Sequence, residues 1–512
     1  MAALPRLDRQ LLRTPGLRAR AGVVVPDATL LDMPERVVQF GTGAFLRGFI
    51  DFFIDEANRR GEFNGRIVAV GSTGSGRDSR INDQDGLYTL SSRGIVDGEL
   101  QVEHRIIGSV SRALSAQSDW SAVLECARNP ELRLVVSNTT EVGITLDDRD
   151  SDPEAAPPRS FPGKLARFLF ERARTFDFDA AKGVIVIPCE LIEDNGDRLR
   201  DIVLTLATRW NLDARFARWI DESAGFCNTL VDRIVPGAPA ADEAAALATT
   251  LGYDDAMLTT AEAYRLFAIE RPANSGDFAA RIGFAGADPG IIVADDIAPY
   301  RLRKVRLLNG THTIAVSLAL LARCQTVREA LEHEAVGRFI RRALLDEIVP
   351  SVEVPGAAQF ARDVLDRFAN PYIRHALIDI TLQGTMKMRV RVVPSIIELA
   401  ERTGRTPVSL AFGFAAFLHF MRGETHEARR AAGERVPPDD HAGEIRAHWR
   451  DCDDSPSAIA RVADAICGDV GLWGTDLRTV PGFADVVSED LIRIQRDGVV
   501  AALDAHLAEV AV

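Results

Sequence analysis

The sequence predicts an α/β fold, with a doubly wound parallel sheet in its amino-terminal part and a mostly α-helical domain in its carboxyl-terminal part. Three observations lead to this prediction. β-Branched apolar runs alternate with helical stretches before residue 300, and the first of these runs ends in a glycine turn that opens into a helix. After residue 300, long helical patterns dominate and β-branched runs become scarce. Alternating strands and helices favour a parallel sheet covered by helices.

The expected elements follow in chain order. The strand-like runs of the sheet are 36–40, 66–70, 132–136 and 183–187, and 290–294 is the last such run before the change of character. Helical spacing covers 50–60, 120–127 and 165–174 between them, and later 326–348, 371–384 and 408–421. A domain usually holds about 100–200 residues, so 512 residues favour two large domains. We predict the boundary after residue 296, which gives domains 1–296 and 297–512.

Composition excludes several classes of protein. The chain has 60 Lys and Arg against 74 Asp and Glu, a net charge of −14, which argues against a nucleic-acid or membrane-surface partner and leaves a small molecule. None of the six cysteines forms a CxxC pair, so neither a disulfide framework nor a zinc ribbon is indicated. Without an apolar signal segment or a run long enough to cross a membrane, a cytoplasmic protein is expected. Both a monomer and a small homo-oligomer fit the sequence.

A glycine turn follows the first strand. The strand 36–40 runs into Gly41-Thr-Gly-Ala-Phe-Leu-Arg-Gly48, and helical spacing begins at Ile50. Such a turn directs backbone N–H groups and a helix amino terminus at one place, which attracts a pyrophosphate. Gly41 permits the tight turn and Gly43 allows close approach. Leu46 stands where the full GxGxxG pattern has its third glycine, and an ordinary strand–helix turn could share the remaining GxG.

The choice of dinucleotide is less defined by the sequence. NAD binding normally uses an acidic residue near the end of the second strand, which bonds the ribose hydroxyls. The first acid after the strand 66–70 is Asp78, later than expected, and its neighbours Arg77 and Arg80 could receive a 2′-phosphate instead. We expect NAD as the cofactor and do not exclude NADP.

The candidate catalytic segment is Lys304-Val-Arg-Leu-Leu-Asn-Gly-Thr-His312. The chain has only four lysines, so a lysine here points to a need for an amine, which can titrate where arginine cannot. On an α-helix, Lys304, Asn309 and His312 fall within an arc of about 140°. Carbonyl reduction needs a proton donor and a group that holds the developing alkoxide. Lys304 suits the first role and Asn309 the second, and His312 could orient the substrate.

A rival interpretation of the same lysine is rejected. Tyr300 and Lys304 form the YxxxK pair of short-chain dehydrogenases, a family that usually carries a serine about a dozen residues before the tyrosine. No serine occurs between Gly276 and Pro299.

Taken together, these motifs resemble the long-chain polyol dehydrogenase family, which includes mannitol dehydrogenases and hexuronate reductases. The resemblance rests on the glycine turn, on Gln84-Asp-Gly-Leu-Tyr88, on Phe226-Cys-Asn-Thr-Leu-Val-Asp-Arg233, on the KxxxxNxxH pattern of 304–312 and on Arg367-Phe-Ala-Asn-Pro-Tyr-Ile-Arg-His375. It implies an expanded Rossmann-type domain, a helical domain, a site between them, and no metal.

Within this family the tagaturonate reductases are the most similar branch. Ser137-Asn-Thr-Thr-Glu-Val-Gly-Ile144, Ile187-Pro-Cys-Glu-Leu-Ile192 and Asn195-Gly-Asp197 carry that likeness, together with Asn370 to His375. It implies reversible reduction of tagaturonate to altronate with NADH. The implied cofactor-binding residues are Gly41, Thr42, Gly43, Ala44, Phe45, Arg47, Asp78, Thr140 and Glu141, and the implied substrate-binding residues are Asn195, Asp232, Asn370, His375 and Lys387.

One departure affects the oxyanion donors. Mannitol dehydrogenases continue after the cysteine at 189 as CDN, which places a second oxyanion Asn, whereas this chain has Cys189-Glu190-Leu191. Either Asn195 supplies that donor or the oxygen is held differently. Asp232 could position Lys304 or His312, or it could form an ion pair with Arg233.

A hexuronate substrate also requires a cation for its carboxylate. The candidates are Arg374, His375, Lys387, Arg389 and Arg391. Residues 387, 389 and 391 would share one face only if their segment were extended. A guanidinium can bind a carboxylate through two hydrogen bonds. Two alternatives stay open. One is the same chemistry on fructuronate or on a polyol such as mannitol, and the other is a dinucleotide-binding sensor without catalysis, which an intact proton donor argues against.

Overall fold

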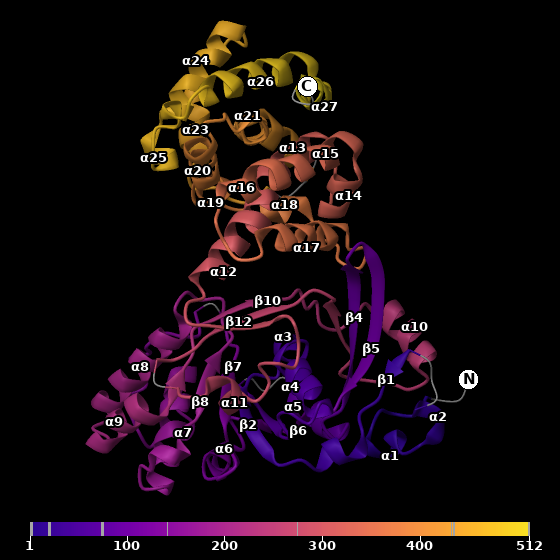
Figure 1. Ribbon diagram of the computed structural model, residues 1–512, viewed down its shortest axis with the longest axis vertical. Coiled ribbons are helices and arrows are strands. Elements are labelled where there is room, and N and C mark those ends of the chain that lie inside the picture. Colours follow the sequence, from indigo (N-terminus) through magenta and orange to yellow (C-terminus); the bar gives the residue numbers. More distant parts are fainter. Residues whose placement is uncertain are drawn as a thin grey trace. The chain divides into compact units, whose positions relative to one another are not determined.

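The computed structural model describes residues 4–18, 22–72, 76–140, 142–273, 275–431, 433 and 436–509. It divides into two compact units (Figure 1). Unit 1 comprises Met1–Gly94 and Leu100–Ile297, and unit 2 comprises Ile95–Glu99 and Ala298–Val512.

Unit 1 is built on a six-stranded parallel sheet in the order β6-β3-β2-β7-β8-β9. Its strands are β2 (Glu35–Phe40), β3 (Arg66–Gly71), β6 (Val110–Ser115), β7 (Leu134–Ser137), β8 (Ile185–Pro188) and β9 (Gly225–Phe226). The chain runs outward from β2 in one direction through β3 and β6, and in the other through β7, β8 and β9. The strand order therefore reverses between β2 and β7, where doubly wound sheets bind their ligands.

Both faces of this sheet are covered, which explains why its strands read as nearly continuous apolar runs. Alternate residues such as Val38, Val68 and Val135 pack against α6 (Trp120–Ala127), α7 (Phe161–Thr175), α8 (Asn195–Arg209) and α9 (Ala214–Ser223). The intervening residues, such as Val37 and Val136, face α4 (Ile50–Arg59) and a second layer of strands. The smaller helices of unit 1 are α1 (Arg9–Leu12), α2 (Pro15–Arg18), η1 (Ala28–Asp32), α3 (Ala44–Arg47), α5 (Arg77–Asp83), η2 (Ala180–Lys182), α10 (Ala241–Leu251) and α11 (Phe278–Ile282).

Two smaller sheets complete unit 1, and our sequence analysis missed most of their strands. One has the order β1-β5-β4-β11, and the other has the order β10-β12-β13. Their bounds are β1 (Val23–Val24), β4 (Tyr88–Val96), β5 (Glu99–Ile107), β11 (Thr259–Glu262), β10 (Thr229–Asp232), β12 (Leu266–Glu270) and β13 (Ile291–Ala294). Much of β4 and β5 is charged or half-exposed, so these strands lack the apolar runs by which buried strands are recognised.

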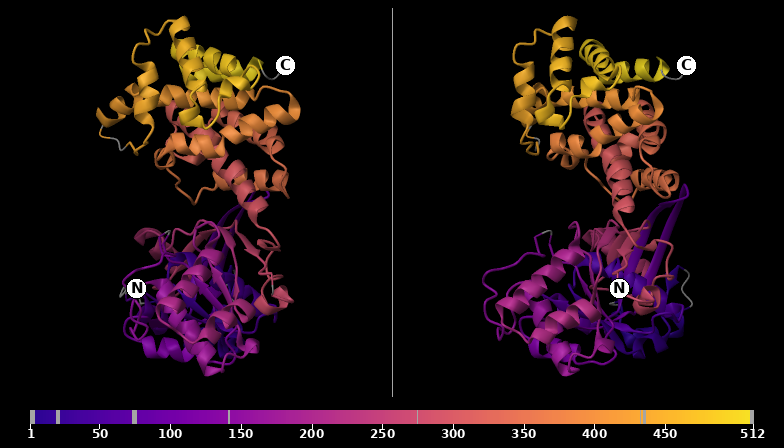
Figure 2. Two further views of the ribbon diagram at one scale, coloured as in Figure 1. Left: turned by 90° about the vertical axis from the view of Figure 1, so that its left-hand side faces the viewer. Right: turned by 60° about the vertical axis from the view of Figure 1, so that its left-hand side comes forward.

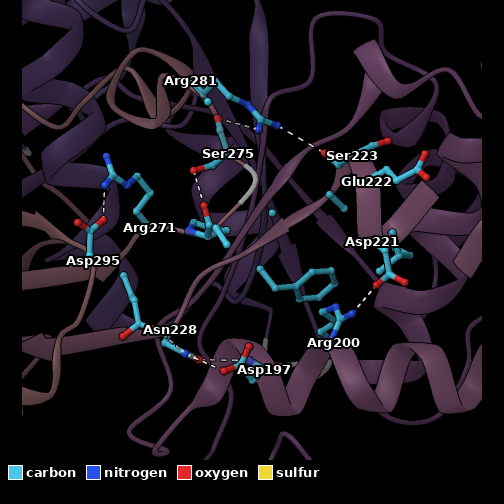
Figure 3. A pocket seen from close by; sticks show the side chains of 18 residues that line it. Asp197, Arg200, Asp221, Glu222, Ser223, Asn228, Arg271, Ser275, Arg281 and Asp295 are labelled. Atoms are coloured by element: carbon cyan, nitrogen blue, oxygen red, sulfur yellow. Dashed lines mark hydrogen bonds and ion pairs between the residues drawn. The ribbon is translucent and has the colours of Figure 1, made fainter. Parts of the chain in front are cut away.

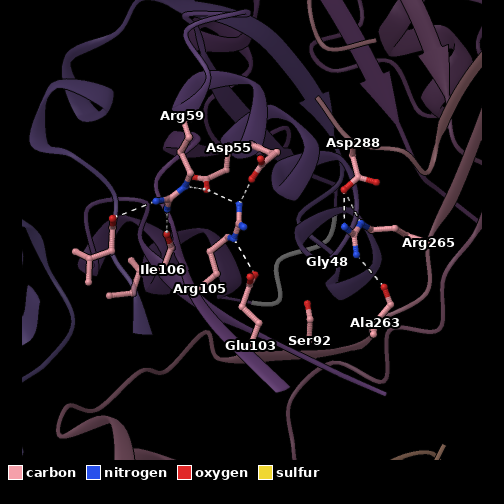
Figure 4. Close-up of polar contacts among 12 residues, drawn as sticks. Gly48, Asp55, Arg59, Ser92, Glu103, Arg105, Ile106, Ala263, Arg265 and Asp288 are labelled. Carbon is pink, nitrogen blue, oxygen red and sulfur yellow. Dashed lines mark hydrogen bonds and ion pairs between the residues drawn. The ribbon is translucent and has the colours of Figure 1, made fainter. Parts of the chain in front are cut away.

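Ion pairs and hydrogen bonds join α4 to the sheet that contains β5 (Figure 4). The Asp55 carboxylate, 1% exposed, accepts from Arg59 at 2.6 Å and from the Gly108 N–H at 2.8 Å. Arg105 on β5 pairs with Glu103 at 3.0 Å and also contacts Glu56. This network fixes the helix that follows the glycine turn.

Unit 2 is almost entirely helical in its described part (Figures 1 and 2). Its first helices are α12 (Ala298–Arg303), η3 (Lys304–Gly310), α13 (Thr311–Leu321), α14 (Val327–Glu332), α15 (Glu334–Arg342), η4 (Ala343–Ile348), α16 (Val349–Ser351), α17 (Ala357–Ala369), α18 (Leu377–Ile380) and α19 (Gly384–Arg391). They are followed by α20 (Val393–Thr403), α21 (Val408–Met421), α22 (Glu424–Ala431), α23 (Ala442–Trp449), α24 (Pro456–Cys467), α25 (Val470–Trp473), η5 (Leu477–Thr479), α26 (Phe483–Asp497) and α27 (Val499–Glu509). The apolar α21 is buried along almost its whole length. Among the described residues, no helix combines the length and the apolar character that a membrane span requires.

The predicted fold class is confirmed, but two of the predicted helices are wrong. The stretch 371–384 is helical only at α18 and at its last residue, because Asn370 Oδ1 accepts the Tyr372 N–H and residue 376 pairs in extended form with Thr326. The stretch 326–348 is broken at His333, which ends α14 and caps α15 by accepting the Val336 N–H through its side chain.

Candidate active site

The glycine turn lies where the strand order reverses. Gly41 follows β2 with φ of +140°, and a Cβ there would lie 2.8 Å from Leu46 Cδ1 and 3.1 Å from the Asn138 carbonyl oxygen. Only glycine fits such a position. The turn leads into α3, a single helical turn for which Gly43 is the N-cap residue. Its backbone can therefore come close to a bound phosphate group.

Asp78 lies at the carboxyl end of the neighbouring strand. Although it stands on α5, its carboxylate lies against Gly71, where a Cβ would come within 2.8 Å of Asp78 Oδ2 and still nearer to Oδ1. Asp78 Oδ1 is buried and has no hydrogen-bond partner among the described residues. Burial and the nearby Asp119 raise the pKa of this carboxyl group. An acceptor left open at the end of the second strand fits the ribose of a dinucleotide.

A cavity of about 490 Å³ opens beside the glycine turn. Its wall includes Gly41 after β2, Ser72 after β3, and Asn138, Thr139 and Thr140 after β7. Arg149, Arg159 and Lys164 line it as well. The lining fits the phosphates of a dinucleotide, because it combines the glycine turn with three basic side chains.

The remaining predicted cofactor residues differ in placement. Thr42, Ala44 and Phe45 continue the turn beside Gly43, and Thr42 is buried. The guanidinium of Arg47 is turned inward, where it donates to the Thr42 carbonyl at 2.6 Å and to Thr259 Oγ1 at 3.2 Å. Arg47 therefore stabilises the backbone of the glycine turn. Glu141 lies outside the described residues.

Asn195 does not offer the second oxyanion donor considered above. Its side chain is fully buried, and its Nδ2 donates to the carbonyls of Pro188 and Glu190 and to Thr229 Oγ1 at 3.0–3.2 Å. Its Oδ1 accepts the Thr229 N–H at 2.9 Å. All its hydrogen-bonding capacity joins β8 to β10, so this suggestion is corrected.

Asp232 ends β10 and is 7% exposed. The contacts of Arg233 do not support the predicted alternative of an ion pair between Asp232 and Arg233. That guanidinium donates to the carbonyls of Gly48 and Glu262 and to Ser92 Oγ. Successive residues of a strand point to opposite faces, which separates the two side chains.

The catalytic segment in unit 2 is not an α-helix. Residues Lys304–Gly310 form a π-helix, followed by α13. An α-helix separates Lys304 and Asn309 by about 140°, whereas the i→i+5 repeat of a π-helix brings them to one face. Both side chains are half-buried, as is that of His312. Short π-helical turns occur frequently at functional sites.

His312 lies among aromatic and cationic groups. Its ring is 4.2 Å from that of Phe368 and 5.0 Å from that of His375. Burial lowers the pKa of His312 well below its usual range, and His375, Arg367, Arg391 and Lys387 lower it further. Burial and Arg367 also lower the pKa of His375, against an opposing effect of Asp379, so both imidazoles favour the neutral form.

The cations near His312 come from α17 and α19. On the helix α19, Lys387 and Arg391 share one side, while Arg389 points elsewhere and donates to the Gly471 carbonyl at 3.3 Å. The Lys387 ammonium donates to the Ile380 carbonyl at 3.1 Å. Arg391 is half-buried and has no ion pair or hydrogen bond of its side chain among the described residues, although burial lowers its pKa. The sequence named both residues among the candidate cations and favoured Lys387, whereas Arg391 is the one whose side chain has no such bond.

The backbone explains why α19 meets the catalytic segment. A Cβ at Gly310 would lie 3.1 Å from the Arg391 carbonyl oxygen, so glycine permits this close approach. Arg367 lies on α17. Asn370 is the buried C-cap residue of that helix, and its Oδ1 accepts the Tyr372 N–H in the turn that follows. Unit 2 therefore collects Lys304, Asn309, His312, His375 and Arg391 around one short stretch of backbone.

A larger cavity of about 740 Å³ in unit 1 contains none of the predicted site residues (Figure 3). Its charges are satisfied within its wall, where Arg200 pairs with Asp221 and Arg271 with Asp295. Arg281 donates to the carbonyls of Ser223 and Ser275. In the described parts of both units, no group of three or more His, Cys, Asp and Glu side chains could hold a metal ion.

Comparisons with known proteins agree with this description. Residues 35–279 match the mannitol dehydrogenase Rossmann domain, and residues 296–495 match the mannitol dehydrogenase C-terminal domain. The altronate oxidoreductase of Bacillus subtilis is 42% identical over 474 residues, which are 92% of this chain and 95% of that protein. The altronate oxidoreductase of Cronobacter sakazakii is 41% identical over 471 residues, 91% of this chain and 95% of that protein.

Two solved structures share the fold. One is mannitol 2-dehydrogenase of Pseudomonas fluorescens in a ternary complex with NAD and D-mannitol, with a TM-score of 0.63 and 24% identity over 98% of this chain and 100% of that chain. The other is a substrate-free D-sorbitol dehydrogenase, with a TM-score of 0.75 and 23% identity over 97% and 100% of the two chains.

Proposed function

The chain belongs to the mannitol dehydrogenase family, and from this premise we propose that it is an NAD-dependent oxidoreductase that interconverts tagaturonate and altronate. Its relatives with about 40% identity over nine-tenths of the chain are altronate oxidoreductases. The observation that carries the choice of a sugar acid is the half-buried Arg391, which forms no ion pair among the described residues and whose charge lies near enough to lower the pKa of His312. A guanidinium binds a carboxylate by two parallel hydrogen bonds.

The cofactor half of the reaction belongs to residues 1–296. Gly41 and Gly43 accommodate the phosphates, Asp78 bonds the ribose, and Thr140 contributes to the wall of the cavity. Bound NADH supplies the hydride that reduces the keto carbon. The open acceptor of Asp78 favours NAD, because a 2′-phosphate would bring a second negative charge to this buried carboxylate.

The substrate half belongs to residues 297–512. Lys304 donates the proton that neutralises the developing alkoxide, and in the oxidative direction its side chain takes the proton back. Asn309, whose side-chain amide has no other partner among the described residues, holds the same oxygen. His312 and His375, both neutral, bond substrate hydroxyls, and Asn370 keeps the turn that carries His375 in place.

We also infer that the enzyme works in the cytoplasm, which the six free cysteines support. Its substrate is a small keto-sugar acid, and it acts as a monomer or a small homo-oligomer.

The test is NADH oxidation with tagaturonate, fructuronate and fructose side by side, repeated with NADPH. We expect turnover on tagaturonate well above the other two, and faster with NADH than with NADPH. A preference for fructose would move the assignment to a mannitol-type dehydrogenase and remove the need for a carboxylate-binding Arg391. NADH binding without turnover on any keto sugar would instead indicate a sensor.

A further inference from the structure

A buried carboxylate behind the dinucleotide cavity has no part in the chemistry described so far. Glu190 follows β8 and is 2% exposed, although it forms no ion pair with any residue that the structure describes. Burial raises the pKa of this carboxyl group. Glutamate is rarely buried in this way unless it is paired, because its desolvation costs several kcal/mol. Its position therefore needs a reason, and its hydrogen bonds supply one.

Three hydrogen bonds to the Glu190 carboxylate come from the neighbouring strand end. Oε1 accepts from the Thr139 N–H at 2.9 Å and from the Thr139 hydroxyl at 3.0 Å. Oε2 accepts from the Ser137 hydroxyl at 3.1 Å. One side chain thus holds both the last residue of β7 and the loop that follows it. The hydroxyl and the N–H of Thr139 are directed at Glu190, not at the cavity.

The residue between these two donors completes the brace. The Asn138 amide donates to the Cys189 carbonyl at 2.7 Å, and its N–H donates to the Phe40 carbonyl at 3.2 Å. The Asn138 carbonyl oxygen is the atom that a Cβ at Gly41 would meet at 3.1 Å. The ends of β2, β7 and β8 are therefore fixed to one another at the place where the strand order reverses.

We propose that Glu190 is a positioning residue for dinucleotide binding: by accepting from Ser137 and Thr139 it holds the loop 138–140 in the shape that forms one wall of the cofactor cavity. The proposal rests on the proposed function only in requiring a dinucleotide in that cavity. Glu190 does not line the cavity, so we assign it no catalytic role. Losing the acceptors would leave the partly buried Thr139 N–H without this partner and release the loop.

The substitutions Glu190→Gln and Glu190→Met separate this role from charge and from packing. Glutamine can accept both Thr139 bonds through Oε1 and donate to the Ser137 hydroxyl through Nε2, which reproduces the brace without a charge. Methionine has a similar length and accepts none of these bonds well. We expect Glu190→Gln to bind NADH within about threefold of the wild type, and Glu190→Met to bind it at least tenfold more weakly, as expected when about 1.4 kcal/mol is lost from a buried hydrogen-bond group.

Glu347 in unit 2 offers a matched control. It is also a buried glutamate with a raised pKa, and it accepts the N–H groups of Ser409 and Leu410 at 2.7 and 2.8 Å. Glu347→Met therefore removes a comparable brace far along the chain from the cavity. We expect it to lower the melting temperature and leave the Kd for NADH unchanged.

The readout is direct NADH binding to the full-length protein, followed by fluorescence or calorimetry without any sugar, with the melting temperature measured alongside. A normal Kd for folded Glu190→Met, or an equal loss in Glu190→Gln, would overturn the proposal. If Glu190→Met does not fold, Thr139→Val decides, because it removes one of the three bonds: a weaker Kd supports the brace and an unchanged Kd contradicts it. Wild-type binding of NADH without turnover on tagaturonate would refute the proposed function alone, whereas failure to bind any nicotinamide dinucleotide would refute both.

Discussion

The imidazole rings of His312 and His375 lie 5.0 Å apart and are inclined by 68°, so that the two histidines meet edge to face. Burial lowers the pKa of both rings, and Arg367 adds to the effect at each. Two neighbouring imidazolium ions would repel each other and the cations of α19. The pair therefore stays neutral in the folded state at pH values at which free histidine takes up a proton.

This relationship predicts how stability depends on pH. Below the unfolded value of 6.5 the unfolded chain binds protons that the folded pair refuses, so the free energy of unfolding falls as the pH decreases. The two histidines therefore make their full contribution to the free energy of unfolding above pH 6.5. That contribution decreases below pH 6.5, by at most about 1.4 kcal/mol per histidine and pH unit. Urea unfolding at pH 7.5 and 5.5 should show a smaller loss for His375→Asn than for the wild type. Equal losses would contradict the assignment of neutral rings.

A second pH dependence of opposite sign follows from Asp51. The Tyr88 hydroxyl lies 2.8 Å from the Arg47 carbonyl oxygen and 2.9 Å from Asp51 Oδ2, yet it carries one proton. Since a carbonyl can only accept, Asp51 satisfies both contacts when it is protonated and donates to Tyr88. Burial raises the pKa of Asp51 from 3.8 to about 7, against smaller opposing effects of Tyr88 and Arg47.

The folded state therefore keeps a proton that the unfolded state loses, and Asp51 makes stability fall as the pH rises from about 4 to 7. An asparagine amide at this position could donate to Tyr88 at every pH. We predict that Asp51→Asn unfolds at a higher urea concentration than the wild type at pH 8, and that this advantage shrinks at pH 5. An advantage that stays constant with pH would show that Asp51 is not protonated in the folded protein.

Arg391 should determine the preference for acids. Arg391→Gln is expected to raise the KM for tagaturonate about 10- to 100-fold, because a hydrogen bond to a charged group contributes about 1.5–3 kcal/mol, and to leave fructose turnover nearly unchanged. Arg389→Gln on the same helix is the matched control, since its side chain is exposed and contacts the Gly471 carbonyl. Steady-state kinetics on both sugars measure the effect. An equal rise for both sugars would assign Arg391 to general packing.

Lys304 should carry the proton transfer. Lys304→Ala is expected to lower kcat about 10²- to 10⁴-fold, the usual contribution of general acid–base catalysis, while the Kd for NADH stays within a few fold. Lys304→Arg should fail as well, because arginine does not release its proton. Lys182→Ala, on η2 in unit 1, is the control that should keep full activity. Near wild-type kcat in Lys304→Ala would refute the mechanism.

The sequence was most informative where structure is local. The apolar runs around Val38, Val68 and Val135 predicted the central strands, because both faces of the sheet are covered and only apolar side chains can be buried there. The strands β4 and β5 were missed because their charged residues are satisfied by partners far along the chain, as Arg105 is by Glu56.

The site was harder to predict, because its geometry also depends on contacts between residues that lie far apart in the sequence. The KxxxxNxxH spacing identified the segment, but neither its π-helical form nor the close approach of its Gly310 to the backbone of Arg391. Lys387 and Arg391 look equivalent in the sequence, and only the bond from Lys387 to the Ile380 carbonyl distinguishes them. Glu190 carries no motif, because its partners lie on another strand.

The most direct test of the account compares tagaturonate with tagatose as substrates for NADH oxidation by the wild-type enzyme. The two keto sugars share their configuration and differ in that tagatose carries a hydroxymethyl group in place of the carboxylate. The account predicts a kcat/KM for tagaturonate at least tenfold higher, since a carboxylate–guanidinium contact contributes about 1.5–3 kcal/mol. Equal kcat/KM values for the two sugars would contradict the claim that this protein is an oxidoreductase of a sugar acid.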